Sequence, residues 1–299
     1  MRNNKLIAII GMILLVLTSL VLAAPQIDFL SLTPSNNSAT NNTFVEINVS
    51  IVESNLNNLT YNWNGTNYTI YSDDLLLMMN FDNLSDLGES NNLVADLSNF
   101  ENNGSTQNGA IYSSSGKYGG AYDFDGTNDF IAIADSSNLN IYQKTSFALW
   151  IYPEAYGDSS EAYIKNIYSD EGNQVEATAI WRLGSKGLDS LKDKLGVNYN
   201  DGDNNDIEST GSVPLNTWTH VVTVTNGTHV NFYFNGILDS SKSYSITPTQ
   251  ISGNWWIGVH SDGETTDRQF NGKIDEMRLW NRSLSTEEVY TEYISNLQK

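Results

Sequence analysis

The sequence predicts an all-β protein in which many short strands form a two-sheet sandwich or a barrel. From residue 73 onward, short runs of β-branched and aromatic residues alternate with turns rich in glycine, asparagine, aspartate and serine. Several turns, among them Asp125-Gly126 and Asn235-Gly236, are dipeptides that favour tight β-hairpins. Only residues 285–297 have a helical pattern, and many short strands at this spacing are typical of sandwiches and barrels.

The individual elements follow from their side chains. Leu75–Phe81 is a continuous apolar run, as expected for a strand that is buried on both faces. The helix is predicted to begin at Ser285, because Ser285 and Glu288 have the spacing of a capping box. Between these segments, the expected strands are Ala121–Phe124, Phe130–Ala134, Ser146–Tyr152, Ala177–Leu183, Leu195–Tyr199, Asp206–Gly211, Thr217–Thr225, His229–Phe234, Ser243–Ile246, Trp255–His260 and Lys273–Trp280.

Residues 1–24 have the pattern of a signal peptide. Met1–Lys5 carries positive charge, Leu6–Leu22 is apolar, and small residues follow at the expected cleavage positions. The apolar run is also close to the length of a membrane span, so an uncleaved N-terminal anchor is the alternative. Both interpretations place the rest of the chain outside the cell, either secreted or at the cell surface. Repeated Asn-x-Ser/Thr sequences agree with a glycoprotein.

Two folded parts are expected after the leader. Residues 25–72 contain short strand candidates and the hairpin dipeptide Asn64-Gly65, so we interpret them as a partial immunoglobulin-like β unit or a glycosylated stalk. A disordered linker is the alternative, which the aromatic and β-branched content disfavours. The pattern becomes denser from Asp73, and residues 73–299 are predicted to form the main domain.

Charge and composition exclude several classes of function. The formal net charge is -20, which repels phosphate backbones and anionic lipid surfaces and therefore argues against nucleic-acid partners. The same charge favours cations, neutral glycans or basic partners, or it simply keeps the protein soluble. The chain has no cysteine and three histidines, and it has no HExxH sequence or serine-triad pattern. Any contact with a membrane would run through the N-terminal segment.

Four phrases, in order, resemble laminin-G-like jelly-roll domains of the concanavalin A-like lectin/glucanase superfamily. They are Tyr118–Phe130, Phe147–Pro153, Trp218–Val222 with Val230–Gly236, and Phe270–Ser285. Their order and spacing agree with the family over residues 75–297, and the part before Asp73 resembles β segments that precede such domains in archaeal surface proteins. The resemblance implies an antiparallel jelly-roll sandwich. Within these phrases and nearby, Trp150, Trp218 and Trp280 are expected to anchor the core between the two sheets.

The resemblance also implies a structural calcium ion where the first long strand meets the last. The residues at these positions are Asp82 and Asp275, and the loop Asn102-Asn103-Gly104 would add carbonyl oxygens. In the alternative, Asp82 caps a turn and Asp275 pairs with Arg278 or a backbone amide. A second acidic stretch contains Asp201 and Asp203 and is similar to the start of an EF-hand loop. It lacks the glycine and the glutamate of that motif, so it is either a solvated turn or part of a ligand-binding rim.

Trp255 and Trp256 are adjacent on a predicted strand, so their side chains should point to opposite faces. One of the two should therefore lie at or near the surface, where it would be a candidate platform for stacking a sugar ring. Packing in the core is the alternative for each.

The superfamily also contains laminarinase-type glycoside hydrolases, which need two carboxylates flanking the scissile bond. On a strand these would be two residues apart. Asp123 and Asp125 have that spacing but run into a turn, while Asp275 and Glu276 are adjacent and expected to face opposite ways. We therefore predict no enzyme but a non-catalytic binding module for a glycan or a surface protein. The alternatives are a structural envelope component without a small ligand and, third, a glycoside hydrolase.

Overall fold

The computed structural model describes residues 24–41, 45–53, 56–139, 144–156, 161–168, 180–184, 193–198, 206–244, 254–261, 266–267 and 269–295. The predicted leader, apart from its last residue, and the acidic residues Asp201 and Asp203 lie outside them. Within the described residues, no helix is long and apolar enough to cross a membrane. The chain forms two compact units, Met1–Leu56 and Asn57–Lys299. The predicted domain boundary lies after residue 72, whereas the segment 57–72 groups here with the second unit. The predicted boundary stays a prediction.

The first unit contains a two-stranded antiparallel ribbon. It consists of β1 (Gln26–Phe29) and β2 (Val49–Val52), and Ile27 pairs with Ile51. Because side chains alternate along a strand, these two isoleucines share a face with Phe29 and Val49.

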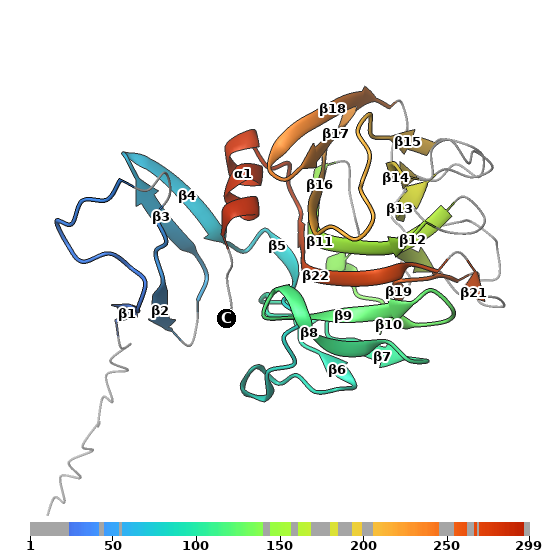
Figure 1. Cartoon of the computed structure of the whole chain (residues 1–299), viewed down its shortest axis with the longest axis horizontal. Helices are drawn as coiled ribbons and strands as arrows, with labels where there is room; N and C mark the ends of the chain where they lie inside the picture. The colour runs from blue at the N-terminus through green and yellow to red at the C-terminus, as the bar shows by residue number, and fades with distance from the viewer. Residues whose placement is uncertain are drawn as a thin grey trace, which may run out of the picture. The chain divides into compact units, whose positions relative to one another are not determined.

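The second unit is a sandwich of two antiparallel sheets, as predicted (Figure 1). Sheet I has the order β18-β17-β16-β11-β22-β9-β8, with β5 also paired to β22. Its strands are β5 (Leu75–Met79), β8 (Ile111–Tyr118), β9 (Gly120–Asp125), β11 (Lys144–Ala155), β16 (Thr219–Asn226), β17 (His229–Phe234), β18 (Ile237–Ser243) and β22 (Asn271–Trp280).

Sheet II has the order β15-β14-β13-β12-β19-β10-β7-β6. Its strands are β6 (Leu93–Val94), β7 (Gly104–Gln107), β10 (Phe130–Ile133), β12 (Glu161–Tyr168), β13 (Ile180–Gly184), β14 (Leu195–Asn198), β15 (Asp206–Glu208) and β19 (Asn254–Ile257). The remaining elements are the hairpins β3 (Leu59–Trp63)–β4 (Thr66–Tyr71) and β20 (His260–Ser261)–β21 (Thr266–Asp267), the 3-10 turns η1 (Ser85–Leu87) and η2 (Ser137–Leu139), and helix α1 (Thr286–Ile294).

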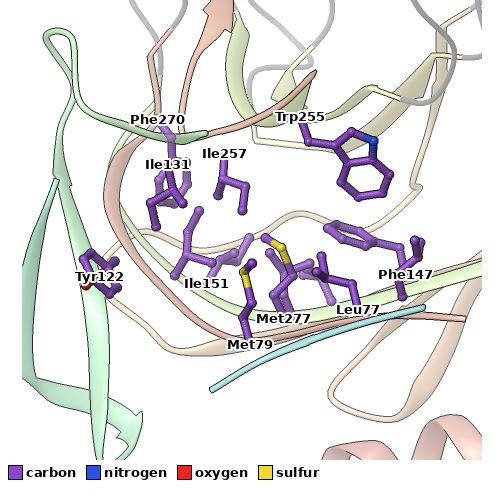
Figure 2. Close-up of a cluster of buried hydrophobic side chains, with 14 of the residues drawn as sticks. Leu77, Met79, Tyr122, Ile131, Phe147, Ile151, Trp255, Ile257, Phe270 and Met277 are labelled. Carbon is purple, nitrogen blue, oxygen red and sulfur yellow. The ribbon is translucent and has the colours of Figure 1, made fainter. Parts of the chain in front are cut away.

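The hydrophobic core lies between the two sheets (Figure 2). Leu77, Phe147 and Met277 enter it from sheet I, and Trp255 and Ile257 enter it from sheet II. Buried apolar area of this kind is the main favourable term in folding, at roughly 25 cal/mol per Å².

Helix α1 covers the outer face of sheet I, the face that points away from the core. Ser285 is the N-cap and forms the predicted capping box with Glu288. The ring of Tyr293 lies 5.6 Å from Trp150, whose neighbours Leu149 and Ile151 point into the core. Trp150 is therefore buried under the helix rather than between the sheets, which corrects the expectation for this residue.

Trp218 also departs from its expected place. It is only half-buried and packs against Tyr152, with the two ring centroids 5.5 Å apart. It is therefore a surface-side residue rather than an anchor of the core between the sheets.

A buried ionic triad joins α1 to β22. Arg278 donates to Glu276 of its own strand at 2.8 Å and to Glu292 of the helix. All three side chains are almost fully buried. The two carboxylates together raise the pKa of Arg278, despite a burial that acts to lower it. Breaking one partner of such a cluster leaves an uncompensated buried charge, which is strongly destabilising.

We expect Glu292→Ala to lower the free energy of unfolding by about 3 kcal/mol, because it leaves Arg278 buried beside a single carboxylate. The matched control is Glu287→Ala, which removes an exposed glutamate from the same helix and should cost less than about 1 kcal/mol. Urea denaturation of both variants measures the difference. Equal losses in the two variants would contradict a structural role for the triad.

His220 is a second buried titratable group beneath the helix. Its ring lies 5.1 Å from Trp150 and 6.0 Å from Tyr293, and its Nδ1 has no hydrogen-bond partner among the described residues. Burial lowers its pKa to about 3, and the positive charges of Arg278 and Lys117 add to the effect. The folded state therefore holds His220 neutral.

This depressed pKa makes stability depend on pH. Below about pH 6.5 the unfolded chain binds a proton at His220 that the folded state refuses until about pH 3. As the pH is lowered from about 6.5 to about 3, we expect the free energy of unfolding of the wild type to fall more steeply than that of His220→Gln. Urea denaturation at a series of pH values measures this difference. His229→Gln, at a half-buried hairpin position, serves as control and should follow the wild type. Parallel curves for wild type and His220→Gln would show that His220 does not titrate as described.

Candidate functional site

The structure separates the two adjacent tryptophans of β19. Trp255 is 1% exposed and belongs to the core, so its ring offers no surface to a ligand (Figure 2). Trp256 points to the outer face of sheet II and is half-buried. Of the two candidate platforms, Trp256 is the one that a ligand can approach.

Small and polar residues lie beside Trp256 across three strands. In register, Trp256 pairs with Ala132 of β10, and Ala132 pairs with Ser105 of β7. The ring of Phe130 lies 4.6 Å from that of Trp256 and is tilted by 51°. Gln107 pairs with Phe130 and donates to the hydroxyl of Ser105 at 3.1 Å. We call these five residues the tryptophan face.

The indole N–H of Trp256 is a buried donor without a partner among the described residues. Buried tryptophan N–H groups usually have an acceptor, so this one is unsatisfied within the described residues. What a ligand can approach is the exposed part of the Trp256 ring with its small and polar neighbours, which suits a ligand with an apolar face and hydroxyl groups.

The second candidate site is the carboxylate pair Asp82 and Asp275. Asp82 follows β5, which pairs with β22, and Asp275 lies on β22. Both side chains are buried, at 6% and 0% exposed. The turn between β8 and β9 donates to both, from Gly120 N to Asp82 at 2.6 Å and from Lys117 N and Tyr118 N to Asp275 at 2.8 and 3.0 Å.

Glycine is required in this turn. Gly119 has a φ of +63°, and a Cβ there would lie 2.2 Å from Oδ1 of Asp82. The turn can therefore reach the carboxylates only because no side chain intervenes.

The electrostatics of the pair favour a positive charge beside it. Burial raises the pKa of Asp275 to about 7, the backbone donors Tyr118 and Lys117 act in the opposite direction, and the charge of Asp82 raises it further. Oδ1 of Asp275 is buried and has no partner in the described part of the chain. Two close carboxylates with an unsatisfied oxygen suit a hard cation.

Glu276 departs from the expected geometry. It has a φ of +51° next to a register shift between β11 and β22, and this bulge breaks the alternation of side chains. Asp275 and Glu276 therefore both lie on the helix-covered side of sheet I, rather than on opposite faces. Burial raises the pKa of Glu276, and the ion pair with Arg278 acts in the opposite direction.

The loop that leads to Gly104 makes its described contacts elsewhere. Gly104 begins β7, and a Cβ at this position would meet the core side chains Ile131 and Met79. Asn102 donates to the carbonyl of Leu76 at 3.0 Å, and its backbone N–H donates to Asp96 at 2.8 Å. The structure thus brings together Asp82 and Asp275, while Gly104 faces the core. In the described ranges, no group of three histidine, aspartate or glutamate side chains is placed to hold a metal ion.

The possible catalytic pair Asp123 and Asp125 has structural partners. Lys273 lies 3.4 Å from Asp123 and 2.7 Å from Glu154. Asp125 accepts from the backbone N–H of Thr127 at 2.7 Å and so shapes the turn.

Comparison with known proteins gives the fold relatives. A family model described as the concanavalin A-like lectin/glucanases superfamily matches residues 125–290. No curated protein sequence matches the chain. Domain 4 of a GH43 extracellular arabinanase from Geobacillus stearothermophilus, solved with arabinotriose, has a TM-score of 0.55 at 21% identity, covering 74% of this chain and 98% of that one.

Two toxin domains are also similar. The ligand-binding domain of botulinum neurotoxin serotype D, solved with N-acetylneuraminic acid, has a TM-score of 0.53 at 16% identity and covers 74% of this chain and 50% of that one. The binding domain of botulinum neurotoxin serotype G has a TM-score of 0.54 at 14% identity, with 73% and 50% covered. The chain spans about half the length of these toxin chains, and likeness at such identity shows the fold alone. By its family match and its fold, the chain belongs to the concanavalin A-like lectin/glucanase superfamily.

Proposed function

We propose that the chain is a non-catalytic carbohydrate-binding module that stacks a sugar on Trp256. The observation that carries the proposal is the tryptophan face, where the half-buried indole of Trp256 is held against Phe130 on the outer side of sheet II. The flat apolar side of a sugar packs on such a ring, while its hydroxyls pair with polar groups at the edge.

The fold relatives and the charge narrow the ligand class. One relative, matched over 98% of its chain, was solved with arabinotriose, and another, matched over half of its chain, was solved with N-acetylneuraminic acid. The net charge of -20 repels anions, which favours neutral glycans for this chain. Asp123 and Asp125 are held by a lysine and a turn, which supports binding without hydrolysis.

The same proposal places the module outside the cell, secreted or held at the surface. The support is the signal-peptide or anchor pattern of residues 1–24. A surface protein as partner, or a purely structural role, are the alternatives that the binding experiment separates.

We expect Trp256→Ala to weaken binding of arabino-oligosaccharides or other neutral glycans about tenfold or more, because it removes the stacking ring. A glycan array followed by calorimetry measures the loss. Trp63→Ala is the matched control, since Trp63 is 53% exposed on β3, away from sheet II. Equal binding by both variants would reject the tryptophan face, and silence of a folded wild type would favour the structural role. Cleavage of the bound glycan would overturn the non-catalytic assignment.

We further propose that Asp82 and Asp275 hold a structural Ca²⁺. The support is the unpaired, buried Oδ1 of Asp275 together with the nearby charge of Asp82. An ion here would join β22 to the end of β5, and its charge would relieve the repulsion between the two carboxylates.

Calcium should then raise the melting temperature of the wild type relative to chelator, and Asp275→Asn should abolish that rise. Asp96→Asn is the matched control. Asp96 is a buried aspartate bonded to Met78 N and Ser98, so this variant should be less stable in both conditions but keep the calcium response. A rise that persists in Asp275→Asn would remove Asp275 from the site.

A further inference from the structure

A pocket of about 260 Å³ lies where β5 begins and β22 ends. Figure 1 shows these two strands in sheet I, and they are paired in register. The pocket is lined by Asp73 and Asp74 before β5, by Ser137 and Asn138 of η2, by Asn281 after β22, and by Phe100. A water molecule takes up about 30 Å³, so the space is that of several waters and suits one sugar ring.

The two carboxylates of the pocket are fixed in place. Asp73 accepts from the amide of Asn99 at 3.1 Å, and Asn99 is itself bonded to the hydroxyl of Tyr71. Asp74 forms an ion pair with Arg282 at 3.4 Å. Such partners hold the acceptors in one orientation before a ligand arrives, which lowers the entropy cost of binding.

The other polar groups of the pocket are free. No hydrogen bond within the described residues engages the side-chain amides of Asn138 and Asn281 or the hydroxyl of Ser137. The backbone N–H groups of the two asparagines are bonded, to Ser136 and to the carbonyl of Asp74, so the backbone is anchored while the amides stay available. An amide offers both a donor and an acceptor, which matches two neighbouring hydroxyls of a sugar.

Apolar and charged walls decide the ligand class. Phe100 is half-buried and packs against the core, and Leu76 is buried beside it. The C–H side of a sugar ring gains apolar contact with such an aromatic wall. Asp73 and Asp74 repel a carboxylate or sulfate and accept hydrogen bonds from hydroxyl or ammonium groups.

We propose that this pocket is a second carbohydrate subsite, which takes a single neutral or amino sugar ring through Asn138, Asn281 and Phe100. The inference rests on the proposed function for its ligand class, but it uses none of the residues of the tryptophan face. The two proposed sites can therefore be tested independently of each other.

The test uses the full chain made without N-glycosylation, because Asn281 begins an Asn-x-Ser sequence and an attached glycan would fill the pocket. Saturation-transfer NMR is recorded with glucose, galactose, glucosamine and glucuronate at millimolar concentration. We expect signals from the first three sugars and a much weaker signal from glucuronate. The pocket is tested with the tryptophan face removed: Trp256→Ala should keep the signals, and adding Asn138→Ala and Asn281→Ala to that variant should lower them about tenfold.

Asn57→Ala is the matched control, since Asn57 is exposed and lies outside the pocket. Because both pocket asparagines are exposed, the added substitutions should leave the fold unchanged, which circular dichroism checks. Three outcomes would overturn the proposal: no signal from any of the sugars, signals in Trp256→Ala that the added asparagine substitutions do not lower, or signals that Trp256→Ala alone removes. Loss of oligosaccharide binding in Trp256→Ala with monosaccharide signals retained would support both sites.

Discussion

Strand β22 is the element on which the rest of the second unit depends. It pairs with β11 along one edge and with β9 and β5 along the other, so it joins the halves of sheet I. Its core-facing residues include Ile274, Met277 and Leu279, while Asp275, Glu276 and Arg278 lie on the side of helix α1. Charged residues on one face of a central strand need partners from neighbouring elements, because a buried charge without a partner costs several kcal/mol. The helix supplies Glu292, and the β8–β9 turn supplies backbone donors to Asp275.

This requirement also decides which face remains available for a ligand. The outer face of sheet I is occupied by α1, whose Tyr293 packs on Trp150. The helix in turn contacts β4 of the β3–β4 hairpin. Sheet II, by contrast, presents Trp256 half-exposed on its outer face. The buried ionic cluster therefore lies on the covered face of sheet I, while the candidate sugar platform lies on the outer face of sheet II.

Much of this fold could be predicted from the sequence, because the strongest signals are local. The apolar run Leu75–Phe81 predicts a strand and the capping box at Ser285 predicts the start of a helix, and the structure has both elements. Where the local signal is weak, the sequence does not predict the strand. The serine-rich segment of β8 is not among the expected strands. Strand β18 begins at Ile237, directly after the Asn235-Gly236 turn, whereas the expected strand begins at Ser243. Serine has little strand propensity, so only pairing with β9 makes β8 a strand.

The candidate sites show the same division between local and long-range information. Opposite faces for Trp255 and Trp256 follow from the period of a strand, and the pairing of Asp82 with Asp275 follows from a family resemblance. The bulge at Glu276 has no such signal, because a left-handed backbone at a glutamate is imposed by the surroundings. For the same reason no sequence pattern places Asn138 and Asn281 in one pocket, since they come from segments that only the sheet pairing brings together.

A shallow platform and a small pocket on one module make sense for a polymeric ligand. Each site alone buries little of a sugar, so each is expected to bind only in the millimolar range, at about -4 kcal/mol. A polysaccharide repeats the same ring many times, and once one ring is bound the next is held at high local concentration. Under this proposal, two weak sites would retain a polysaccharide more firmly than either site does alone when one chain is long enough to reach both. The acidic surface supports this use, because its charge repels anionic competitors while leaving neutral rings unaffected.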